Sequence, residues 1–485
     1  MEGYTKREKV VVIGAGISGL ACAYRLKQLG LPALVLEAAN RPGGCIHTIR
    51  KGGSLFELGP QCPRFPAALW QLVCELGLER DFVAGKPNAK RYIYRNRRLH
   101  LAPFSPAGLL RTSLVSRRTK LRILGEVFQT SRPPQREETL AAFVARKFGN
   151  DVLENLVDPI VATVFLGDAD RLGMESAFPA LRKWEENHGS LVRGALRARG
   201  ARREPDPNGH GNPPSAKDAK GGPSALHVTD SLPSLGSFRT GMGQLTESLA
   251  SALGPQLRYG SEIVAVAQDR SDSRRFGWRI QFRSGGSLCA EHLVFAVPAY
   301  VIADLLRPII PALTLELEEI EYAPLALISS VYRRNAVQNA LDGFGFMVPR
   351  KEGLHTICTF WNSSLFEERT PEDHALITSF ARTDTGSGAP SEDEVQRSVQ
   401  QENARILGIV EKPVDQVFWS DSRALPQYNV GHQQRIARIE DALALWPDLA
   451  IIGNFLKGRS IGECVELANA TAEQVFKKLS GGAGE

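Results

Sequence analysis

The stretch VVVIGAGISGL, residues 10–20, decides the fold of this chain. An apolar run ends in a glycine turn, a helical pattern follows, and a second apolar run ends on Glu37. Gly14 permits the tight turn, Gly16 lets the backbone approach a pyrophosphate, and Gly19 lets the helix pack on the sheet. The helix N-terminus attracts phosphate, and an acid after the second strand accepts hydrogen bonds from a ribose. The stretch therefore predicts a dinucleotide-binding β-α-β unit.

The residues just after Glu37 separate FAD from NAD. Asn40-Arg41-Pro42-Gly43-Gly44 is a second glycine turn with an arginine close behind the acid. Pro-Gly-Gly alone also makes an ordinary surface turn, but its position after the acid favours a cofactor contact. The pattern resembles the RxGG motif of flavoproteins with two dinucleotide-binding domains. The sequence has no second GxGxxG for a nicotinamide, so we expect the substrate itself to reduce the flavin.

A third glycine-rich stretch, IIGNFLKGRSIGECVELANA, occupies residues 451–470. It reads as an apolar strand, a turn and a long amphipathic helix. Gly453, Gly458 and Gly462 would bring backbone N–H groups to one place, and the positive end of a helix stabilises the electron-rich side of a reduced flavin. A strand-to-helix turn without a ligand is the alternative interpretation.

The order of elements predicts an α/β fold with three parts. A family resemblance, given below with the residues that carry it, implies that these parts are a Rossmann-like FAD-binding domain of discontinuous segments, an α/β substrate domain with a mainly antiparallel sheet, and a mostly helical domain that associates with a membrane. The expected boundaries are 1–78, 232–298 and 417–485 for the FAD-binding domain, 79–93 and 299–416 for the substrate domain, 94–200 for the helical domain, and 201–231 for a flexible loop. The run SLFELGP at residues 54–60 predicts a further strand of the first sheet.

Positive charge is concentrated in residues 86–125, which carry eleven lysines or arginines and no acid. Because the net charge is +6, the rest of the chain sums to 6 − 11 = −5. The cations alternate with Leu99, Leu101, Phe104, Leu109, Leu110 and Leu114, which is typical of a helix in an anionic interface. A packed helical hairpin with a solvated basic face explains the pattern equally well.

Composition gives weaker bounds on the class of protein. Seven scattered cysteines form no CxxC pair, which favours a reducing compartment and predicts no metal site. The first residues lack the apolar core of a secretory signal, and no run approaches the roughly 20 apolar residues of a membrane span. We therefore expect a cytoplasmic protein that attaches peripherally to the inner face of the cell membrane. The basic stretch carries no nucleic-acid-binding motif, so nucleic acid is not an expected partner.

Four segments together resemble the protoporphyrinogen oxidase family of haem biosynthesis, within the amine-oxidase and phytoene-desaturase superfamily. They are the N-terminal unit, FELGP at Phe56–Pro60, LPQYNVGH at Leu425–His432, and GNFLKGRSIGECVE at Gly453–Glu466. The resemblance implies that FAD removes six electrons from a porphyrinogen, protoporphyrinogen IX in the first instance, and passes them to dioxygen to give hydrogen peroxide. It leaves a homodimer open.

The resemblance also implies a set of site residues. Its flavin contacts fall on Gly14, Gly16, Ile17, Ser18, Gly19, Glu37, Ala38, Arg41, Gly43, Gly44, Gly59, Pro60, Ile263, Arg459, Ser460 and Ile461. No residue is assigned an acid-base or nucleophilic role, because hydride transfer from a porphyrinogen needs orientation more than a strong base. The residues that would position the tetrapyrrole are Phe344, Met347, Phe380 and Arg91, the last as a propionate partner.

One departure from the family affects the expected substrate. Animal members continue FELGP with arginine, and this sequence has Gln61, so a carboxylate contact there is missing or moved to Arg64. Coproporphyrinogen III is therefore an alternative to protoporphyrinogen IX. Two further alternatives are another flavin oxidase of the superfamily that acts on an amine or a carotenoid, and a non-catalytic flavin-binding membrane adaptor.

Overall fold

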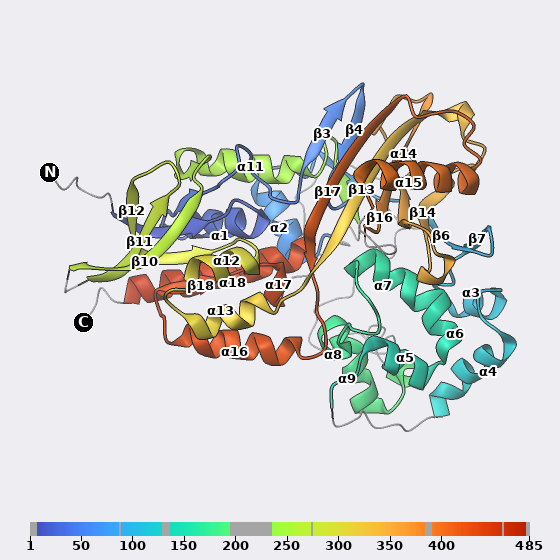
Figure 1. Ribbon diagram of the computed structural model, residues 1–485, viewed down its shortest axis with the longest axis horizontal. Coiled ribbons are helices and arrows are strands. Elements are labelled where there is room, and N and C mark those ends of the chain that lie inside the picture. Colours follow the sequence, from blue (N-terminus) through green and yellow to red (C-terminus); the bar gives the residue numbers. More distant parts are fainter. Residues whose placement is uncertain are drawn as a thin grey trace, which may run out of the picture.

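The computed structural model describes residues 7–86, 89–128, 136–194, 235–272, 275–383, 390–457 and 460–481 (Figure 1). An α/β lobe occupies one end of the molecule, and a second sheet and a group of helices lie together at the other end. The expected flexible loop at 201–231 lies outside the described residues.

The first sheet is built around β1 (Arg7–Ile13), whose last four residues are fully buried. Four neighbours run parallel in this sheet: β2 (Leu34–Leu36), β9 (Leu257–Arg258), β12 (Ser287–Phe295) and β18 (Leu449–Ile451). β10 (Ile263–Asp272) and β11 (Arg275–Phe282) extend it in antiparallel fashion beyond β12. The β-α-β unit expected from the first glycine turn is present.

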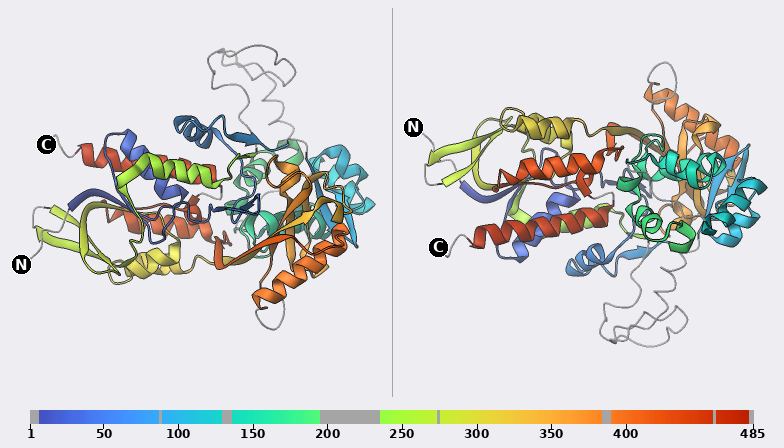
Figure 2. Two further views of the ribbon diagram at one scale, coloured as in Figure 1. Left: turned by 90° about the horizontal axis from the view of Figure 1, so that it is seen from above. Right: turned by 90° about the horizontal axis from the view of Figure 1, so that it is seen from below.

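Helices cover both faces of the first sheet, because successive side chains of a strand point to opposite faces. Val10 and Val12 of β1 face α1 (Ile17–Gln28), α2 (Ala67–Glu75), α11 (Gly243–Leu253) and α18 (Ile461–Gly481). Val11 and Ile13 face α12 (Ala299–Leu306), α13 (Pro311–Glu318) and α16 (His432–Ala444). α1 and α18 lie side by side (Figure 2).

Two short two-stranded antiparallel sheets accompany this sheet. β3 (Thr48–Lys51) pairs with β4 (Ser54–Glu57), and β5 (Phe82–Ala84) pairs with β8 (Gly236–Phe238). The prediction that SLFELGP returns to the first sheet is wrong. The run is buried at all four strand positions, but its ladder partner is the local strand β3, and an apolar pattern does not reveal which strand pairs with which.

The second sheet has seven strands in the order β17-β13-β16-β15-β14-β6-β7, and only β14 and β6 pair in parallel. Their bounds are β6 (Lys90–Arg95), β7 (Arg98–Leu101), β13 (Tyr322–Arg333), β14 (Gly343–Met347), β15 (Thr356–Trp361), β16 (His374–Ala381) and β17 (Asp415–Pro426). α14 (Asn362–Leu365) follows β15, and α15 (Glu392–Leu407) packs on β13 and β16. The expected boundaries at 93 and 417 fall inside β6 and β17, because both strands are held in this sheet by their full ladders.

The described part of 94–200 begins with strand residues of β6 and β7 and is helical from residue 106 onward. The helices are α3 (Pro106–Arg111), α4 (Arg117–Gly125), α5 (Leu140–Lys147), α6 (Asn150–Val152), α7 (Asp158–Phe165), α8 (Met174–Ala177) and α9 (Pro179–His188). Lys147 is fully buried in their core and pairs with Glu185 at 3.0 Å. None of the helices in the described ranges combines the length and apolar character that a bilayer crossing requires.

Candidate functional site

The carboxyl ends of the parallel strands bring the three glycine-rich stretches to one edge of the first sheet. The chain after β12 hydrogen-bonds to β1 through Ala296 N and Ile13 O at 2.8 Å. The chain after β18 hydrogen-bonds to β12 through Ile452 N and Phe295 O, also at 2.8 Å. The C-terminal turn therefore lies two strands from the first glycine turn, and in open parallel sheets this edge is where ligands bind.

The glycines of the first turn are subject to different steric constraints. Gly14 has φ +102°, and a Cβ there would lie 2.6 Å from the carbonyl oxygen of Ala296. A Cβ on Gly19 would lie 2.0 Å from the carbonyl oxygen of Gly14. A Cβ on Gly16, which caps the N-terminus of α1, would meet no atom within 4 Å. Gly16 thus faces open space at the positive end of a helix, which fits a pyrophosphate.

The second glycine turn packs directly on the first. Gly43 N donates to Ala15 O at 2.8 Å, and Gly43 bridges to Gly16 in parallel. Arg41 donates to the carbonyl oxygens of Gly44 at 2.8 Å and Pro42 at 3.2 Å. Arg41 therefore holds its own turn in shape, while its expected contact with a diphosphate stays a prediction.

Glu37 lies at the carboxyl end of β2, where the sequence places it. Its carboxylate accepts from Ala15 N at 2.6 Å and from Ala39 N at 2.8 Å, so it joins the first turn to the residues after β2. Ser261 N donates to Glu37 O at 2.8 Å, and this places Ile263, two residues further on, beside the same strand end. Ala38, which follows Glu37 in the chain, is exposed.

The N-terminus of α18 completes this edge. Ser460 and Glu463 cap the helix reciprocally, with Ser460 N donating to Glu463 at 3.0 Å, and Ile461 is buried. Burial raises the pKa of the Cys464 thiol to about 12, an effect opposed by the neighbouring Ser18 hydroxyl on α1. The two helix N-termini are therefore adjacent. Gly458 and Arg459 lie outside the described residues.

The turn after β4 packs against the loop of the second glycine turn. A Cβ on Gly59 would lie 2.0 Å from the carbonyl oxygen of Cys45, so Gly59 and Pro60 follow the Gly43–Ile46 loop closely. Cys45 is exposed as a residue, but burial of its thiol raises the pKa of that group, and the thiol contributes electrostatically to the pKa of both Cys464 and Tyr322. Sequence reasoning did not select Cys45, although it directly follows Gly44.

These residues fit FAD. The open Gly16 position, the adjoining Gly43 turn and two neighbouring helix N-termini offer backbone donors along one strand edge. Gly14, Gly16, Ile17, Ser18 and Gly19 would hold the pyrophosphate, Glu37 the ribose, and Ser460 and Ile461 the flavin end.

A row of aromatic rings crosses the second sheet on the face toward α7. The ring centroids of Phe344 and Phe360 are 5.7 Å apart, and those of Phe360 and Phe380 are 5.2 Å apart. Met347 packs in the same cluster. Phe344 and Met347 would point to opposite faces of a regular strand, but Gly345 has φ +137° and the β14 register shifts there, so both reach one face.

Helix α7 forms the opposite wall. Ala162 and Leu166 pack against the cluster of Met347, Phe360 and Phe380. Leu166 ends α7 in the left-handed region with φ +51°, which is costly for a branched side chain. The three rings, the Met347 thioether and Leu166 are all only partly buried, so each keeps some surface that a ligand could contact.

Arg91 reaches the same face from β6. Its guanidinium lies 4.5 Å from the ring centroid of Phe344 and 5.6 Å from that of Phe104. Burial lowers the pKa of Arg91, and the nearby positive charge of Arg64 lowers it further. Arg64 is exposed, and within the described ranges neither arginine has a carboxylate within ion-pair distance. Two close cations without an acid favour an anionic ligand.

Gln61 does not stand in for the missing arginine. It is buried, its amide nitrogen donates to Glu57 O at 2.9 Å and Gly59 O at 2.8 Å, and its oxygen accepts from Asn362 at 2.8 Å. All of these bonds hold the turn after β4. Sequence reasoning also missed Phe360 and Leu166, which only the strand order and the position of α7 bring to the aromatic row.

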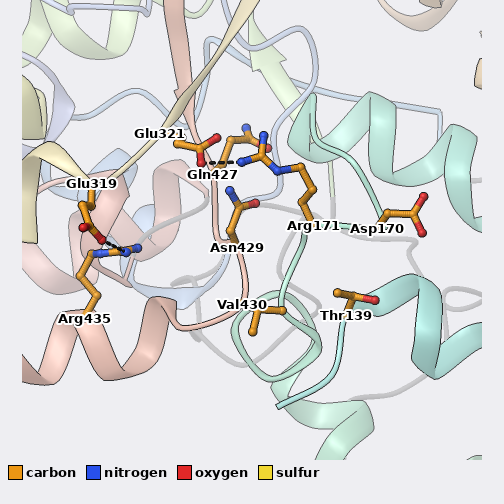
Figure 3. Close-up of a pocket in the computed structure, with 9 residues that line it drawn as sticks. All are labelled: Thr139, Asp170, Arg171, Glu319, Glu321, Gln427, Asn429, Val430 and Arg435. Atoms are coloured by element: carbon orange, nitrogen blue, oxygen red, sulfur yellow. Dashed lines mark hydrogen bonds and ion pairs between the residues drawn. The ribbon is translucent and has the colours of Figure 1, made fainter. Parts of the chain in front are cut away.

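Two cavities lie outside the aromatic row, and one of them reaches Glu463, which caps α18. One of about 470 Å³ is lined by Thr139, Asn429 and the ion pairs Arg171–Glu321 and Arg435–Glu319 (Figure 3). Another of about 640 Å³ lies between α8, α16 and α18 and includes Tyr428 and His432. Neither contains a residue that the sequence assigned to the tetrapyrrole.

Comparison with known proteins places the chain in a family. Residues 17–476 match the family model for flavin containing amine oxidoreductase. The chain is 30% identical to the chloroplastic protoporphyrinogen oxidase of Oryza sativa subsp. japonica, over 97% of this chain and 88% of the relative. It is 26% identical to the coproporphyrinogen III oxidase of Bacillus subtilis (strain 168), over 98% and 99%.

A solved structure from Exiguobacterium sp. 255-15, proposed to be a protoporphyrinogen oxidase, has the same fold. The two structures superpose with a TM-score of 0.79 at 22% identity, over 98% of this chain and 99% of the other. The flavin binding inferred from the three glycine turns agrees with the family model. The chain belongs to the flavin-containing amine oxidoreductases, and within them to the protoporphyrinogen oxidase family.

Proposed function

We propose that this flavoprotein oxidises a porphyrinogen to a porphyrin, taking protoporphyrinogen IX to protoporphyrin IX in haem biosynthesis. The main support for this proposal is the partly buried aromatic row of Phe344, Phe360 and Phe380. The guanidinium of Arg91 lies at its end and has no carboxylate partner among the described residues. A flat apolar macrocycle with propionates needs such a combination: rings to pack on and a cation for a carboxylate. The relatives named for porphyrinogen oxidation support the same substrate class.

The residues of the chain act by binding and orientation. The aromatic row and Leu166 would hold the macrocycle between α7 and the second sheet, and Arg91 would pair with a propionate. Bound FAD supplies the electron acceptor, and six electrons leave per porphyrin. We propose that three dioxygen molecules take these electrons together with six protons and become three hydrogen peroxides. Positioning is then the main catalytic contribution of the protein.

The direct experiment mixes the purified FAD-loaded protein with protoporphyrinogen IX in air. We expect porphyrin fluorescence to rise and hydrogen peroxide to appear at three per porphyrin. The same assay under nitrogen tests dioxygen as the acceptor. If neither protoporphyrinogen IX nor coproporphyrinogen III gives porphyrin above the rate without protein, the proposal is wrong.

Arg91→Ala tests the propionate contact. A charge-assisted pair to a carboxylate contributes on the order of 1.5–3 kcal/mol, so we expect the KM for the porphyrinogen to rise about tenfold or more with FAD content unchanged. Lys90→Ala is the matched control, because Lys90 is the adjacent cation on β6 but already pairs with Asp342 at 2.5 Å. An unchanged KM in Arg91→Ala would remove Arg91 from the substrate site.

Coproporphyrinogen III is the second candidate substrate. Gln61 is committed to the turn after β4, and Arg64 lies close to Arg91, so the pair of cations favours a substrate with more than one carboxylate at this end. A side-by-side comparison of kcat/KM for the two porphyrinogens decides between them. Loss of the coproporphyrinogen preference in Arg64→Ala would assign the second carboxylate contact to Arg64.

We also propose that the protein attaches peripherally to an anionic membrane at the inner face of the cell membrane. Six large apolar side chains are exposed around α3 and α4, among the cations of the basic stretch: Leu101, Phe104, Leu110, Leu121, Leu124 and Phe128. Apolar side chains next to cations are what an anionic interface binds. The sequence-based set needs correction at three positions: Leu114 is buried against Ile93 and Ala102, and Leu99 and Leu109 are half-buried and pack against the cores of the second sheet and of the helices. A homodimer stays a prediction.

A further inference from the structure

The segment 427–432, which carries most of the LPQYNVGH motif, connects the end of β17 to the start of α16. Its backbone is tied to the helical part of the molecule. Gly173 N donates to Tyr428 O at 2.8 Å, and Val430 N donates to Arg171 O at 3.0 Å. Gly431 N donates to the carboxylate of Glu137 at 2.8 Å. The cavity in Figure 3 lies against this segment and is bordered by two ion pairs.

The buried side chains of the segment point the other way, to the chain after β18. Tyr428 is 4% exposed, and its hydroxyl donates to the carbonyl oxygen of Asn454, the first residue of α17 (Asn454–Lys457). The ring of His432 lies on that of Tyr428, with centroids 4.4 Å apart. Burial lowers the pKa of His432 to about 4, against the opposite effect of the backbone of Leu456 and Phe455, so the imidazole is neutral at pH 7.

Tyr428 therefore holds the first residue of α17 directly. His432 makes no hydrogen bond through its ring nitrogens within the described residues; it supports the Tyr428 ring and lines the same cavity as Leu456 and Lys457 of α17. This helix leads within a few residues to Ser460 and the N-terminus of α18, which lies beside Ser18 of the first glycine turn. A shift of α17 would move that N-terminus relative to α1. Neither Tyr428 nor His432 is in the set of residues that would touch FAD or the porphyrinogen.

We propose that Tyr428 and His432 are positioning residues for the flavin end of the FAD site. They fix α17, and through it the N-terminus of α18, so that the helix end meets the flavin at the geometry that stabilises its reduced form. The inference rests on FAD binding at this strand edge, and it gives the LPQYNVGH motif a role beyond a connection between two domains.

The test compares Tyr428→Phe and His432→Gln with Tyr332→Phe. Tyr332 is a matched control because it is as buried, at 2% exposure, but lies in the core of the second sheet. Three quantities are measured on each folded variant: the Kd for FAD from flavin fluorescence, the flavin midpoint potential, and kcat and KM for the porphyrinogen.

We expect Tyr428→Phe to bind FAD about tenfold more weakly, as expected for one lost buried hydrogen bond, with a lower midpoint potential. His432→Gln should shift both quantities in the same direction, because the ring that supports Tyr428 is lost. We expect kcat to fall with KM for the porphyrinogen unchanged, and Tyr332→Phe to match the wild type in all three quantities. If Tyr428→Phe and His432→Gln lower thermal stability but leave the FAD Kd and the potential at wild-type values, the residues only pack and the inference is overturned.

The two proposals fail in distinguishable ways. The FAD Kd and the midpoint potential need no porphyrinogen, so they test the positioning role even if the wild type proves inactive toward both porphyrinogens. Conversely, the wild type can be active while substitution of Tyr428 and His432 leaves the FAD affinity and the midpoint potential unchanged. That result would support the proposed function and contradict the positioning role.

Discussion

At the scale of single residues, the three glycines of the first turn are required for different physical reasons. Gly14 and Gly19 are required by the protein itself, because side chains there would collide with backbone carbonyls. Gly16 has ordinary extended backbone angles and empty space beside it, so nothing in the protein alone requires glycine. The constraint at Gly16 comes from the cofactor.

This difference predicts opposite outcomes for two substitutions. Gly16→Val should fold normally but purify without FAD, because its side chain occupies the space where the pyrophosphate would lie. Gly19→Val should fold poorly, because its Cβ would lie 2.0 Å from Gly14 O. Circular dichroism melting and the ratio of flavin to protein absorbance measure the two effects. A yellow, fully loaded Gly16→Val protein would contradict the cofactor assignment.

A buried histidine far from the site predicts the acid sensitivity of the fold. His292 of β12 is 2% exposed, and burial, with a smaller effect of Lys478, lowers its pKa from 6.5 to about 4. The unfolded chain therefore takes up a proton first as the pH falls. Protonation of His292 does not affect the free energy of unfolding above pH 6.5. As the pH falls from 6.5 toward 4 the free energy of unfolding decreases, and the loss reaches about 3 kcal/mol once both states are protonated.

His292→Phe should flatten the pH dependence of the free energy of unfolding between pH 6.5 and 4. Urea unfolding at a series of pH values, compared between variant and wild type, gives the difference directly. Equal slopes in the two proteins would mean that His292 is protonated in the folded state at its ordinary pKa.

At the scale of elements, α4 shows how an exposed helix face differs from a packed one. Leu121 and Leu124 are one turn apart and exposed, and Phe128 beyond the helix is 86% exposed. The cations Arg117, Arg118, Lys120 and Arg122 lie on the same helix. Such a face has no partner within the described part of the chain, which is why we propose that it meets a membrane surface.

Replacing Leu121 and Leu124 together with serine should weaken binding to vesicles that contain anionic lipid, because the apolar area that enters the interface is lost. The binding of the wild type should also fall with added salt. Leu445→Ser is the matched control, since Leu445 is a comparably exposed leucine, at 80%, at the end of α16. If the double variant cosediments with the vesicles as well as the wild type does, or if the control variant loses as much binding, this face is not the membrane-binding surface.

At the scale of the whole molecule, the proposed substrate site depends on how the helical part is held against the second sheet. Arg350, in a short turn after β14, connects to both ends of α7. Its backbone N–H donates to Asp158 at 2.8 Å, and its guanidinium donates to Asp168 at 2.5 Å and to Gly167 O at 2.7 Å. One residue therefore sets the distance between α7 and the aromatic row.

Arg350→Ala should loosen α7 and raise the KM for the porphyrinogen severalfold with FAD content unchanged, because the flavin edge belongs to the other sheet. Hydrogen exchange of the α7 amides should become faster in the same variant. Lys351→Ala is the control, because Lys351 makes a single exposed ion pair, to Glu154 at 3.0 Å. If both variants behave alike, Arg350 does not hold the substrate space.

The sequence by itself determined the features that short-range sterics control. The glycine turn, the helix after it and the strands β10 to β16 follow from local alternation and from backbone positions where a Cβ does not fit. The FAD end of the site was predictable for the same reason, because Gly14, Gly43 and Glu37 act within thirty residues of one another.

Only the tertiary structure decided which distant residues meet. The pairing of β18 with β12 brings the last turn to the first, the irregular backbone at Gly345 turns Phe344 and Met347 to one face, and the local pairing of β3 and β4 keeps SLFELGP out of the main sheet. Arg64 lies beside Arg91, and Tyr428 beside α17, for the same reason. Strand order and register depend on contacts between residues far apart in the chain, and a local sequence pattern does not predict those contacts.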